Sequence, residues 1–503
     1  MVMGFDVIVV GGGSAGCAAA VRLSEDPNRR VLLLEAGPDP RPLPELVSDA
    51  SLQARLLLET PYVTLYPTTR PADGSVFYSL AGRIMGGGSS VNAMAAPRPT
   101  KRDLDGWAAL GNPGWSYDEL LPVLRRMESD RDFPDDPIHG SSGPLHIERP
   151  FLLDSPASEP VRAYIDRALS MGLPSCPDLN GPDPFGVCAS PYSIKDGRRQ
   201  STVVAYLDGA RDRPNLTVIA EALATRLGVA GSRADFVEFR KDGQAQRAHG
   251  HHFLLTAGAF HSPQVLMLSG IGPAAALRRL GIAPVRELPG VGENYQDHAV
   301  VQMTFDGPTG FTEDWIVARF RLMTRSDPSL PGANFHIFTR PPAEVPGIRR
   351  MMAISAHLLE QRSRGRLVFA SGDPEAVPEV DARLLVDPED VRAMTATMGF
   401  IAELVGHPSQ AKYYGPLMRP SPGDDWAAFA RTTHDSYHHG AGTCKMGPAS
   451  DPMAVVDHRL QVHGMDNLWV ADASIMPVVP HANTNLTAIM IGEVVSDNIK
   501  ALG

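Results

Sequence analysis

The sequence predicts an α/β fold in which a doubly wound, mainly parallel sheet is interrupted by a second, inserted unit. A strand, a glycine-rich turn, a helix and another strand follow one another at residues 5–10, 14–23 and 31–34. Short apolar runs recur far along the chain and are predicted to rejoin the first sheet, at 216–220, 253–256 and 468–470. Proline- and glycine-rich stretches such as 178–186, and a region of different composition at about 300–420, separate these elements, and residues 150–195 and 300–420 are predicted to form the inserted unit.

The composition indicates a folded protein with more than one packed unit. A chain of 503 residues is too long for one small hydrophobic core. Its content of 43% hydrophobic and 20% charged residues is typical of a globular protein. The formal charge of -11 opposes nucleic-acid binding, because neutralising phosphates requires clustered Lys and Arg. No apolar stretch is long enough to span a bilayer, and no charged leader precedes the first apolar run. We expect a cytoplasmic protein without a nucleic-acid partner or an integral membrane segment.

Cysteine usage favours neither a disulfide framework nor a metal site. The four cysteines are few and irregularly spaced, at Cys17, Cys176, Cys188 and Cys444. Cys444 is expected to be a small buried residue, since no paired base pattern marks it as a nucleophile. This cysteine pattern is typical of a reducing compartment.

The turn after the first strand predicts a dinucleotide-binding site. Gly11, Gly13 and Gly16 form the pattern G-x-G-x-x-G. The first glycine permits a tight turn, the second lets a pyrophosphate approach, and the third lets helix and strand pack closely. Glu35 ends the next strand and can accept hydrogen bonds from an adenosine ribose, which favours a cofactor without a 2′-phosphate. This pattern does not separate FAD from NAD.

Four later segments resemble the signatures of the glucose–methanol–choline (GMC) oxidoreductase family. The glycine-rich segment at 82–92 resembles the first signature, in which a loop runs along the flavin, and 258–273 resembles the long second signature. Residues 289–298 and 471–477 resemble two further family motifs, the latter the late flavin-contacting stretch. The resemblance extends from Phe5 nearly to the last residue.

This resemblance implies a Rossmann-like FAD-binding domain with an inserted α+β substrate-binding domain. The discontinuous FAD-binding domain would comprise 1–150, 196–299 and 425–503, and the substrate-binding domain 151–195 and 300–424. Asn92 and Met94 would lie along the isoalloxazine face, and Ala224 would approach the adenine. The full set of residues implied to bind FAD is Gly11, Gly13, Ser14, Ala15, Gly16, Glu35, Ala36, Arg83, Gly87, Ser90, Asn92, Met94, Ala224, Asp472, Ala473, Asn483 and Thr484.

The attachment of the flavin is expected to be non-covalent. Some choline-oxidising members carry a histidine immediately before the asparagine of the first signature and bind the flavin through it. Here Val91 occupies that position. Because valine cannot form this bond, FAD should dissociate on denaturation.

A catalytic pair is implied near the carboxyl terminus. The run from His438 to Gly447 resembles the family's catalytic histidine loop and aligns His439 with the active histidine, while its partner position falls at Asn483. Imidazole can take the hydroxyl proton, since its ordinary pKa lies near neutrality. An asparagine amide can donate to developing alkoxide charge without adding a net charge. The result is a His–Asn pair where other members use His–His.

Neighbouring residues leave alternatives open. His438 would be the base if the alignment were shifted by one residue, and Asn485 could be confused with Asn483. His481 also lies close to the partner position. The other histidines considered are expected to be structural or surface groups: His251, His252, His261 and His298.

The implied reaction is oxidation of a small primary or secondary alcohol to an aldehyde or ketone. Oxygen or another electron carrier is the acceptor, and the sequence does not distinguish an oxidase from a dehydrogenase. The motifs resemble choline dehydrogenases as well as aryl- and furfuryl-alcohol oxidising members. Choline would require an aromatic and acidic cage, to which Trp315, Phe335 and Phe338 are candidate contributors. The alternatives are a dehydrogenase that re-oxidises a mycofactocin-type redox peptide and a flavin-containing hydroxynitrile lyase-like enzyme.

Overall fold

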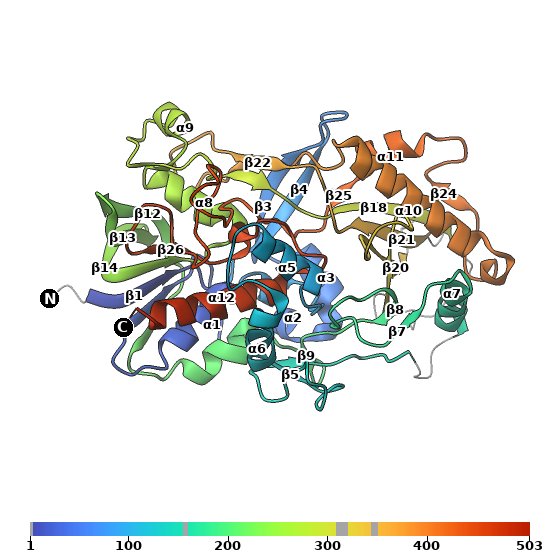
Figure 1. Cartoon of the computed structure of the whole chain (residues 1–503), viewed down its shortest axis with the longest axis horizontal. Helices are drawn as coiled ribbons and strands as arrows, with labels where there is room; N and C mark the ends of the chain where they lie inside the picture. Colours follow the sequence, from blue (N-terminus) through green and yellow to red (C-terminus); the bar gives the residue numbers. More distant parts are fainter. Residues whose placement is uncertain (1–3, 154–158, 308–319, 344–350, 503) are drawn as a thin grey trace.

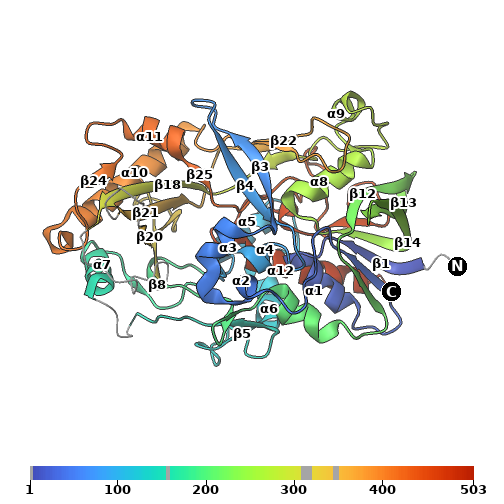
Figure 2. The ribbon, with the colours of Figure 1, turned by 180° about the vertical axis from the view of Figure 1, so that it is seen from behind.

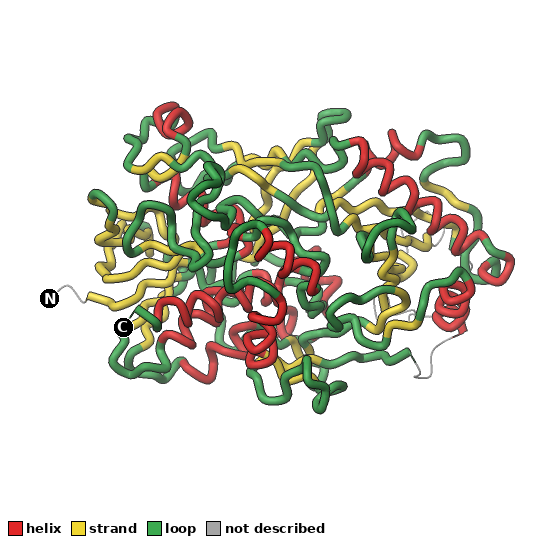
Figure 3. Tube along the Cα trace, in the orientation of Figure 1, coloured by secondary structure: helices red, strands yellow, loops and turns green. Residues whose placement is uncertain are grey.

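The computed structural model describes residues 4–153, 159–307, 320–343 and 351–502. Two large sheets lie at opposite ends of the molecule, with helices across the middle and along one end (Figure 1). Figure 3 shows the corresponding groups of strands at the left and right. Each sheet has its own apolar core.

The seven-stranded sheet at the left of Figure 1 begins with β1 (Gly4–Val10) and β2 (Val31–Leu34), which pair in parallel. Val7–Val10 and Val31–Leu34 are almost fully buried, as expected for strands covered on both faces. α1 (Ser14–Leu23) follows β1 and packs against α12 (Thr484–Lys500). The remaining strands are β11 (Leu216–Ile219), β12 (Leu223–Ala230), β13 (Arg233–Lys241), β14 (Gln244–Leu255) and β26 (Leu468–Val470).

The three distant apolar runs join this sheet as predicted. β11 pairs with β2, β14 pairs with β1, and β26 pairs with β14, all in parallel. β12 and β13 extend the sheet by an antiparallel meander from the first half of β14. The predicted α/β fold class is therefore confirmed.

The eight-stranded sheet is antiparallel except for one pair at its edge. α10 (Pro388–Gly406) contacts it along β21, and α7 (Glu159–Ser170) and α11 (Trp426–Thr433) pack nearby. Its strands are β7 (Ser175–Cys176), β8 (Gly186–Ala189), β18 (Ala299–Asp306), β19 (Phe320–Thr324), β20 (Phe335–Ala343), β21 (Met351–Leu358), β24 (Leu417–Arg419) and β25 (Asp435–Ser436).

A five-stranded sheet lies between the two large sheets, and Figure 2 shows its β3–β4 hairpin rising between them. Its strands are β3 (Val63–Thr69), β4 (Val76–Gly82), β17 (Glu293–Tyr295), β22 (Gly365–Val368) and β23 (Glu379–Asp381). The remaining pairs are β5 (Glu128–Asp130) with β6 (Leu145–Ile147), β9 (Ile194–Lys195) with β10 (Arg198–Arg199), and β15 (Ile271–Gly272) with β16 (Arg286–Glu287). The other α-helices are α2 (Glu45–Ser48), α3 (Gln53–Glu59), α4 (Gly88–Val91), α5 (Lys101–Ala109), α6 (Tyr117–Met127), α8 (Gly258–Leu268) and α9 (Ala274–Arg279).

The predicted domain ranges stay a prediction, although the sheets can be set beside them. All strands of the seven-stranded sheet fall in the ranges assigned to the FAD-binding domain. The eight-stranded sheet draws mainly on the ranges assigned to the substrate-binding domain, but its β25 lies beyond residue 424. Within the described part of the chain, no helix is both long and apolar enough to cross a membrane.

Candidate active site

The glycines in the turn between β1 and α1 allow close approach of the neighbouring backbone and of a ligand. Gly11 has a φ of +109°, and a Cβ there would lie 2.5 Å from the carbonyl oxygen of Thr256. A Cβ on Gly16 would lie 1.9 Å from the carbonyl oxygen of Gly11, so helix and strand pack without a side chain between them. At Gly13 the nearest atom beyond its chain neighbours is 3.9 Å away. The first turn of α1, with Ser14 and Ala15, then presents N–H groups that have no intrahelical acceptor.

The second glycine-rich segment lies directly on the first. The N–H of Gly86 donates to the carbonyl oxygen of Gly12 over 2.7 Å. A Cβ on Gly87 would lie 2.8 Å from the Cα of Gly13. Ser90 is fully buried, and its hydroxyl donates to a carbonyl oxygen of its own loop over 2.8 Å. Two segments that are about seventy residues apart thus form one small-residue cradle, which fits the pyrophosphate and flavin of FAD.

Glu35 lies beside this cradle with its carboxylate buried. One oxygen accepts the N–H of Gly12 over 2.8 Å, and the other accepts the N–H of Gly37 over 2.7 Å. Burial raises the pKa of Glu35 to about 7, despite the two N–H groups. Each carboxylate oxygen can accept more than one hydrogen bond, so ribose hydroxyls find an acceptor here.

A cavity of about 730 Å³ opens next to Glu35. Ala36 and Arg83 line it, together with Tyr62 and Leu223 from neighbouring elements. Ala224 follows Leu223 in β12. The cavity therefore adjoins three of the residues predicted to contact the nucleotide, and its place beside Glu35 fits the adenosine end of FAD.

Asp472 joins two of the family-like segments. Its carboxylate accepts the N–H of Gly258 and the hydroxyl of Ser262 at one oxygen, and the N–H of Ser474 at the other. Ala473 accepts the N–H of Gly442 over 3.1 Å, which brings the histidine loop to the same place. Asp472 therefore acts on the protein chain, and any hold on the flavin would come through the backbone that it positions.

The end of the first signature contains a sharp backbone bend. Met94 has a φ of +59°, and its N–H donates to Asn92 Oδ1 over 2.9 Å. The buried Arg199 donates through Nη1 to both the carbonyl oxygen and Oδ1 of Asn92. Arg199 was not predicted as a site residue, since no local sequence signal links it to Asn92, 107 positions earlier.

His439 and Asn483 lie in direct contact. Asn483 Nδ2 is 3.0 Å from His439 Nε2, while Asn483 Oδ1 accepts a hydrogen bond from Arg321 Nη1 over 2.7 Å. Because an arginine only donates, the amide oxygen must face Arg321 and the amide N–H must face His439. Asn485 lies elsewhere, where its Oδ1 accepts the hydroxyl of Ser14 over 2.7 Å. Thr484 begins α12 between these two contacts.

A chain of hydrogen bonds fixes the proton on His439. His298 Nε2 lies 3.1 Å from the carbonyl oxygen of Pro480 and must donate to it. The other nitrogen of a neutral His298, Nδ1, then accepts, and it lies 2.9 Å from His439 Nδ1. His439 therefore carries its proton on Nδ1, and its Nε2 keeps a lone pair facing the amide of Asn483.

Burial keeps both imidazoles neutral. It lowers the pKa of His298 to about 3 and holds the pKa of His439 well below its usual value, with the neighbouring His298 adding to the second shift. His298 was expected to be structural or on the surface; it is fully buried and contacts the predicted base. His438 is exposed, in a left-handed conformation with a φ of +61°, and lies 3.2 Å from the Ser436 hydroxyl through its Nδ1.

Asp297 holds the histidine loop in place. Its carboxylate accepts the N–H groups of His298 and His439 and the hydroxyl of Ser436. Burial raises its pKa to about 6, although these donors favour the charged form. A single carboxylate thus orders the backbone beneath both imidazoles.

A second buried histidine, His481, has acidic partners. Its Nδ1 lies 2.5 Å from Asp103, and its Nε2 lies 3.5 Å from Glu360. Burial lowers the pKa of His481, but the charges and hydrogen bonds of these carboxylates outweigh burial and raise it to about 9. Asp103 also accepts the N–H groups of His481 and Thr100, so α5 is tied to the segment before Asn483.

The eight-stranded sheet supplies a wall of aromatic and basic groups beside His439. The rings of Tyr437 and His439 are 4.3 Å apart between centroids, and His357 stacks on Phe338 at 4.5 Å. Arg321 from β19 and His336 from β20 complete this wall. No local sequence signal marks the members of this wall, because strand pairing brings them together.

The candidate contributors to an aromatic cage can be placed only in part. Phe335 and Phe338 are three residues apart on β20, so their side chains point to opposite faces of the strand. Phe338 faces the wall beside His439, while Phe335 packs into the core of the eight-stranded sheet. Trp315 lies outside the described residues.

His261, which was expected to be structural, hydrogen-bonds Tyr66 and Gln264. His251 and His252 lie within β14, and the side chain of His251 is largely exposed. Cys444 is fully buried, as expected for a small core residue.

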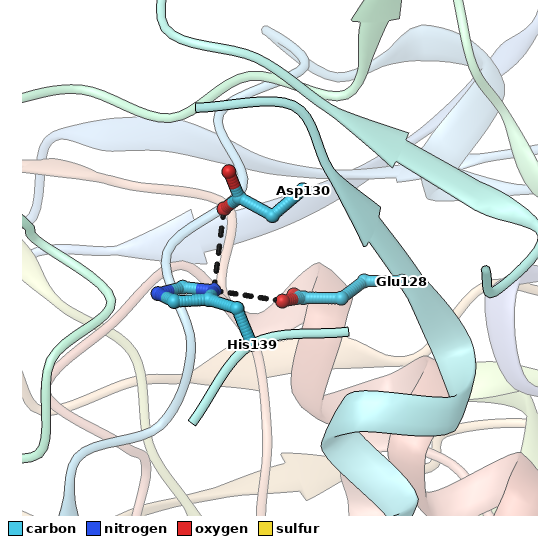
Figure 4. Close-up of side chains that lie close together, drawn as sticks. All are labelled: Glu128, Asp130 and His139. Atoms are coloured by element: carbon cyan, nitrogen blue, oxygen red, sulfur yellow. Dashed lines mark hydrogen bonds and ion pairs between the residues drawn. The ribbon is translucent and has the colours of Figure 1, made fainter. Parts of the chain in front are cut away.

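A buried cluster outside this site has the spacing of metal ligands. Figure 4 shows His139 Nδ1 between the carboxylates of Glu128 and Asp130. Arg98 pairs with Glu128, and Arg149 pairs with Asp130. Burial alone would lower the pKa of His139, yet its acidic partners raise it to about 9. With Arg98 and Arg149 paired to its two carboxylates, the cluster forms an ion-pair network that joins β5 to the loop after it.

Comparison with known proteins identifies the family. A family model described as GMC oxidoreductase matches residues 5–300 with its amino-terminal part and 361–492 with its carboxy-terminal part. The chain belongs to the GMC oxidoreductase family. This confirms the resemblance found in the sequence, and it makes the protein an FAD-dependent alcohol oxidoreductase.

Relatives of this GMC oxidoreductase match it along nearly their whole length. A 5-(hydroxymethyl)furfural oxidase from Methylovorus sp. (strain MP688) is 35% identical over 98% of each chain. Mitochondrial choline dehydrogenase from Mus musculus is 34% identical over 99% of this chain and 89% of its own. Among solved structures, pyridoxine 4-oxidase from Mesorbium loti has a TM-score of 0.91 at 28% identity and covers 98% of each chain.

Proposed function

We propose that this GMC oxidoreductase oxidises a primary or secondary alcohol to an aldehyde or ketone, with His439 as base and Asn483 as hydrogen-bond donor. The observation that carries the proposal is the 3.0 Å contact between His439 Nε2 and Asn483 Nδ2. The hydrogen bonds to their neighbours make His439 Nε2 an acceptor and Asn483 Nδ2 a donor, and these two atoms face one another.

A hydroxyl group that enters between them would donate to His439 Nε2 and accept from the Asn483 amide. The O–H bond then breaks with its proton moving to His439, and Asn483 stabilises the developing alkoxide. Bound FAD would supply the acceptor for the hydride that leaves the same carbon as the carbon–oxygen double bond forms. The imidazolium that results is charged, and the loop that Asp297 orders keeps its ring in position.

Non-covalent binding of FAD is part of the proposal. Val91 is buried at the position where a covalent link would require histidine. The yellow colour should leave the protein with the small-molecule fraction after denaturation and filtration. Flavin absorbance that stays with the denatured chain would contradict non-covalent binding.

The electron acceptor is proposed to be oxygen or another electron carrier, which includes a mycofactocin-type redox peptide. Relatives named as an oxidase and as a dehydrogenase are almost equally similar to this chain. A measurement of the electron acceptor therefore has to distinguish the two activities. Stoichiometric peroxide formed with oxygen consumption would exclude a strict dehydrogenase. Turnover confined to a dye or a carrier would exclude an oxidase.

The experiment that tests the function is an anaerobic screen of the purified yellow protein against small alcohols. Loss of flavin absorbance on mixing is expected for at least one alcohol, and the carbonyl product should appear in equal amount. A hydroxynitrile lyase-like enzyme would instead release cyanide from a cyanohydrin and leave the flavin oxidised. That result would overturn the proposed oxidation.

A further inference from the structure

Arg321 is a buried cation beside the proposed catalytic pair. Its side chain is 2% exposed, its Nη1 donates to Asn483 Oδ1, and the same nitrogen lies 3.4 Å from His336 Nδ1. No carboxylate among the described residues lies within ion-pair distance of Arg321. A buried guanidinium without a counter-ion is costly, and such a charge is usually paired in a folded protein.

The donors around Arg321 also lack acceptors. Arg321 Nε and His336 Nε2 are buried and have no hydrogen-bond partner in the described structure. Because Arg321 donates toward His336 Nδ1, the proton of a neutral His336 lies on Nε2. Arg321 Nε and His336 Nε2 are therefore N–H groups for which the described residues supply no acceptor, and the positive charge beside them has no carboxylate partner among those residues.

His481 provides a contrast to Arg321, because it is a second charged side chain near Asn483 and it has acidic partners. Both charged groups lie close to Asn483, but His481 contacts Asp103 and Glu360. Glu360 in turn contacts Arg102 over 2.8 Å. Near Asn483, the charge of His481 is therefore balanced by carboxylates of the protein, whereas the described residues supply no carboxylate to Arg321.

We propose that the alcohol substrate carries a carboxylate, which binds Arg321 while the hydroxyl group binds His439 and Asn483. This inference rests on the proposed function and narrows its substrate class. A carboxylate supplies the counter-charge and accepts hydrogen bonds from a guanidinium in a planar, two-oxygen arrangement. The flat face of Phe338, whose ring centroid lies 5.8 Å from the Arg321 guanidinium, suits a substrate with an aromatic ring. A quaternary ammonium substrate such as choline would instead meet a like charge.

Binding is tested first with an unreactive pair, para-toluate and its methyl ester, by calorimetry on the FAD-loaded enzyme. The acid should bind more tightly than the ester. Arg321→Gln should weaken acid binding by about 10- to 150-fold, the range expected when a charged hydrogen bond is lost. Arg321→Lys should restore part of that loss, because it keeps the charge but not the planar donor pair. The ester should respond much less.

Arg366→Gln is the matched control. Arg366 lies in β22, where its side chain is 51% exposed and pairs with Asp381. Its loss should leave binding of both compounds unchanged. Equal binding of acid and ester by the wild-type enzyme, or an equal loss of both in Arg321→Gln, would overturn the inference. An equal loss of both compounds would mean that Arg321 positions Asn483 or the flavin and does not bind the substrate carboxylate.

Reduction of the flavin is tested next with para-hydroxymethylbenzoate and its methyl ester, without oxygen. The acid should be preferred by the wild-type enzyme, and Arg321→Gln should abolish that preference. Reduction by the ester but not by the acid would overturn the carboxylate inference and leave the alcohol oxidation standing. If no alcohol in the wider screen reduced the flavin, the proposed function itself would be wrong. Equal FAD content and melting temperature in Arg321→Lys and the wild type establish that the fold is intact.

Discussion

Two buried histidines on either side of Asn483 carry opposite protonation states. His439 contacts a neutral imidazole and an amide, and its pKa lies well below the usual value. His481 contacts two carboxylates, and its pKa is raised to about 9. Since both side chains are almost inaccessible to solvent, burial does not decide the difference; the charges of the partners do.

The two histidines therefore suit different tasks. Neutral His439 has a lone pair that can take a proton, whereas charged His481 has none. His481 instead anchors the segment that carries Asn483, because both its side chain and its backbone N–H bind Asp103. The carbonyl oxygen of Pro480, one residue earlier, sets the proton on His298.

His439→Gln should have the largest effect on catalysis. Loss of a general base costs about 10²- to 10⁴-fold, so anaerobic flavin reduction should slow by about 10³-fold. FAD should stay bound, since the described side-chain hydrogen bonds of His439 are to His298 and Asn483. Stopped-flow absorbance measures the rate, and the flavin-to-protein absorbance ratio measures the cofactor content.

The exposed neighbour His438 provides the matched control for this variant. His438→Gln should change the reduction rate by less than about threefold. If His438→Gln were the slow variant and His439→Gln the fast one, the base would be the other histidine and the alignment of the loop would be wrong by one residue.

His298→Leu should give the next largest effect. It removes the acceptor that holds the proton on His439 Nδ1, so the base can adopt the unproductive tautomer. The loss of a buried hydrogen-bond partner predicts a reduction rate about 10- to 100-fold slower. The dissociation constant of the alcohol should stay the same in stopped-flow titrations. A variant that weakens alcohol binding without slowing reduction would assign His298 to the substrate instead.

His481→Gln should act on stability rather than on chemistry. The pKa of His481 in the folded protein, about 9, lies above the ordinary 6.5, so its stabilisation is complete below about pH 6.5 and is lost as pH rises through 9. Relative to His481→Gln, the wild-type free energy of unfolding should fall by up to about 3 kcal/mol over this interval. Urea unfolding at several pH values measures it. Parallel pH profiles would show that His481 is not charged in the folded state.

The smallest effect is expected from pH on the reaction itself. A base with a pKa well below its usual value stays deprotonated through neutrality, and its rate is lost only as pH falls through that low pKa. Wild-type flavin reduction should therefore change by less than about twofold between about pH 6 and about pH 8. A tenfold fall for each pH unit below neutrality would mean that His439 titrates in the ordinary range and lacks the proposed environment.

The amino-terminal elements could be predicted from local sequence signals. The strand at 31–34 and the helix at 14–23 have the predicted bounds, because buried parallel strands form continuous apolar runs and a glycine turn marks the helix start. The family motifs likewise led to the prediction of His439 and Asn483 as the catalytic pair.

The wall beside His439 could not be predicted in this way. Arg321 and Asn483 are 162 residues apart, and His298 and His439 are 141 apart, so their contacts depend on strand pairing across the whole chain. The pairing of β20 with its neighbours also decides which aromatic side chain faces the site, as Phe335 and Phe338 demonstrate.

Nitrogen NMR of the histidine-labelled enzyme tests the central claim most directly, with His439→Gln and His481→Gln used to assign the two rings. At neutral pH the account predicts one proton on His439, located on Nδ1, and protons on both nitrogens of His481. A proton on His439 Nε2, or an imidazolium at His439, would contradict it.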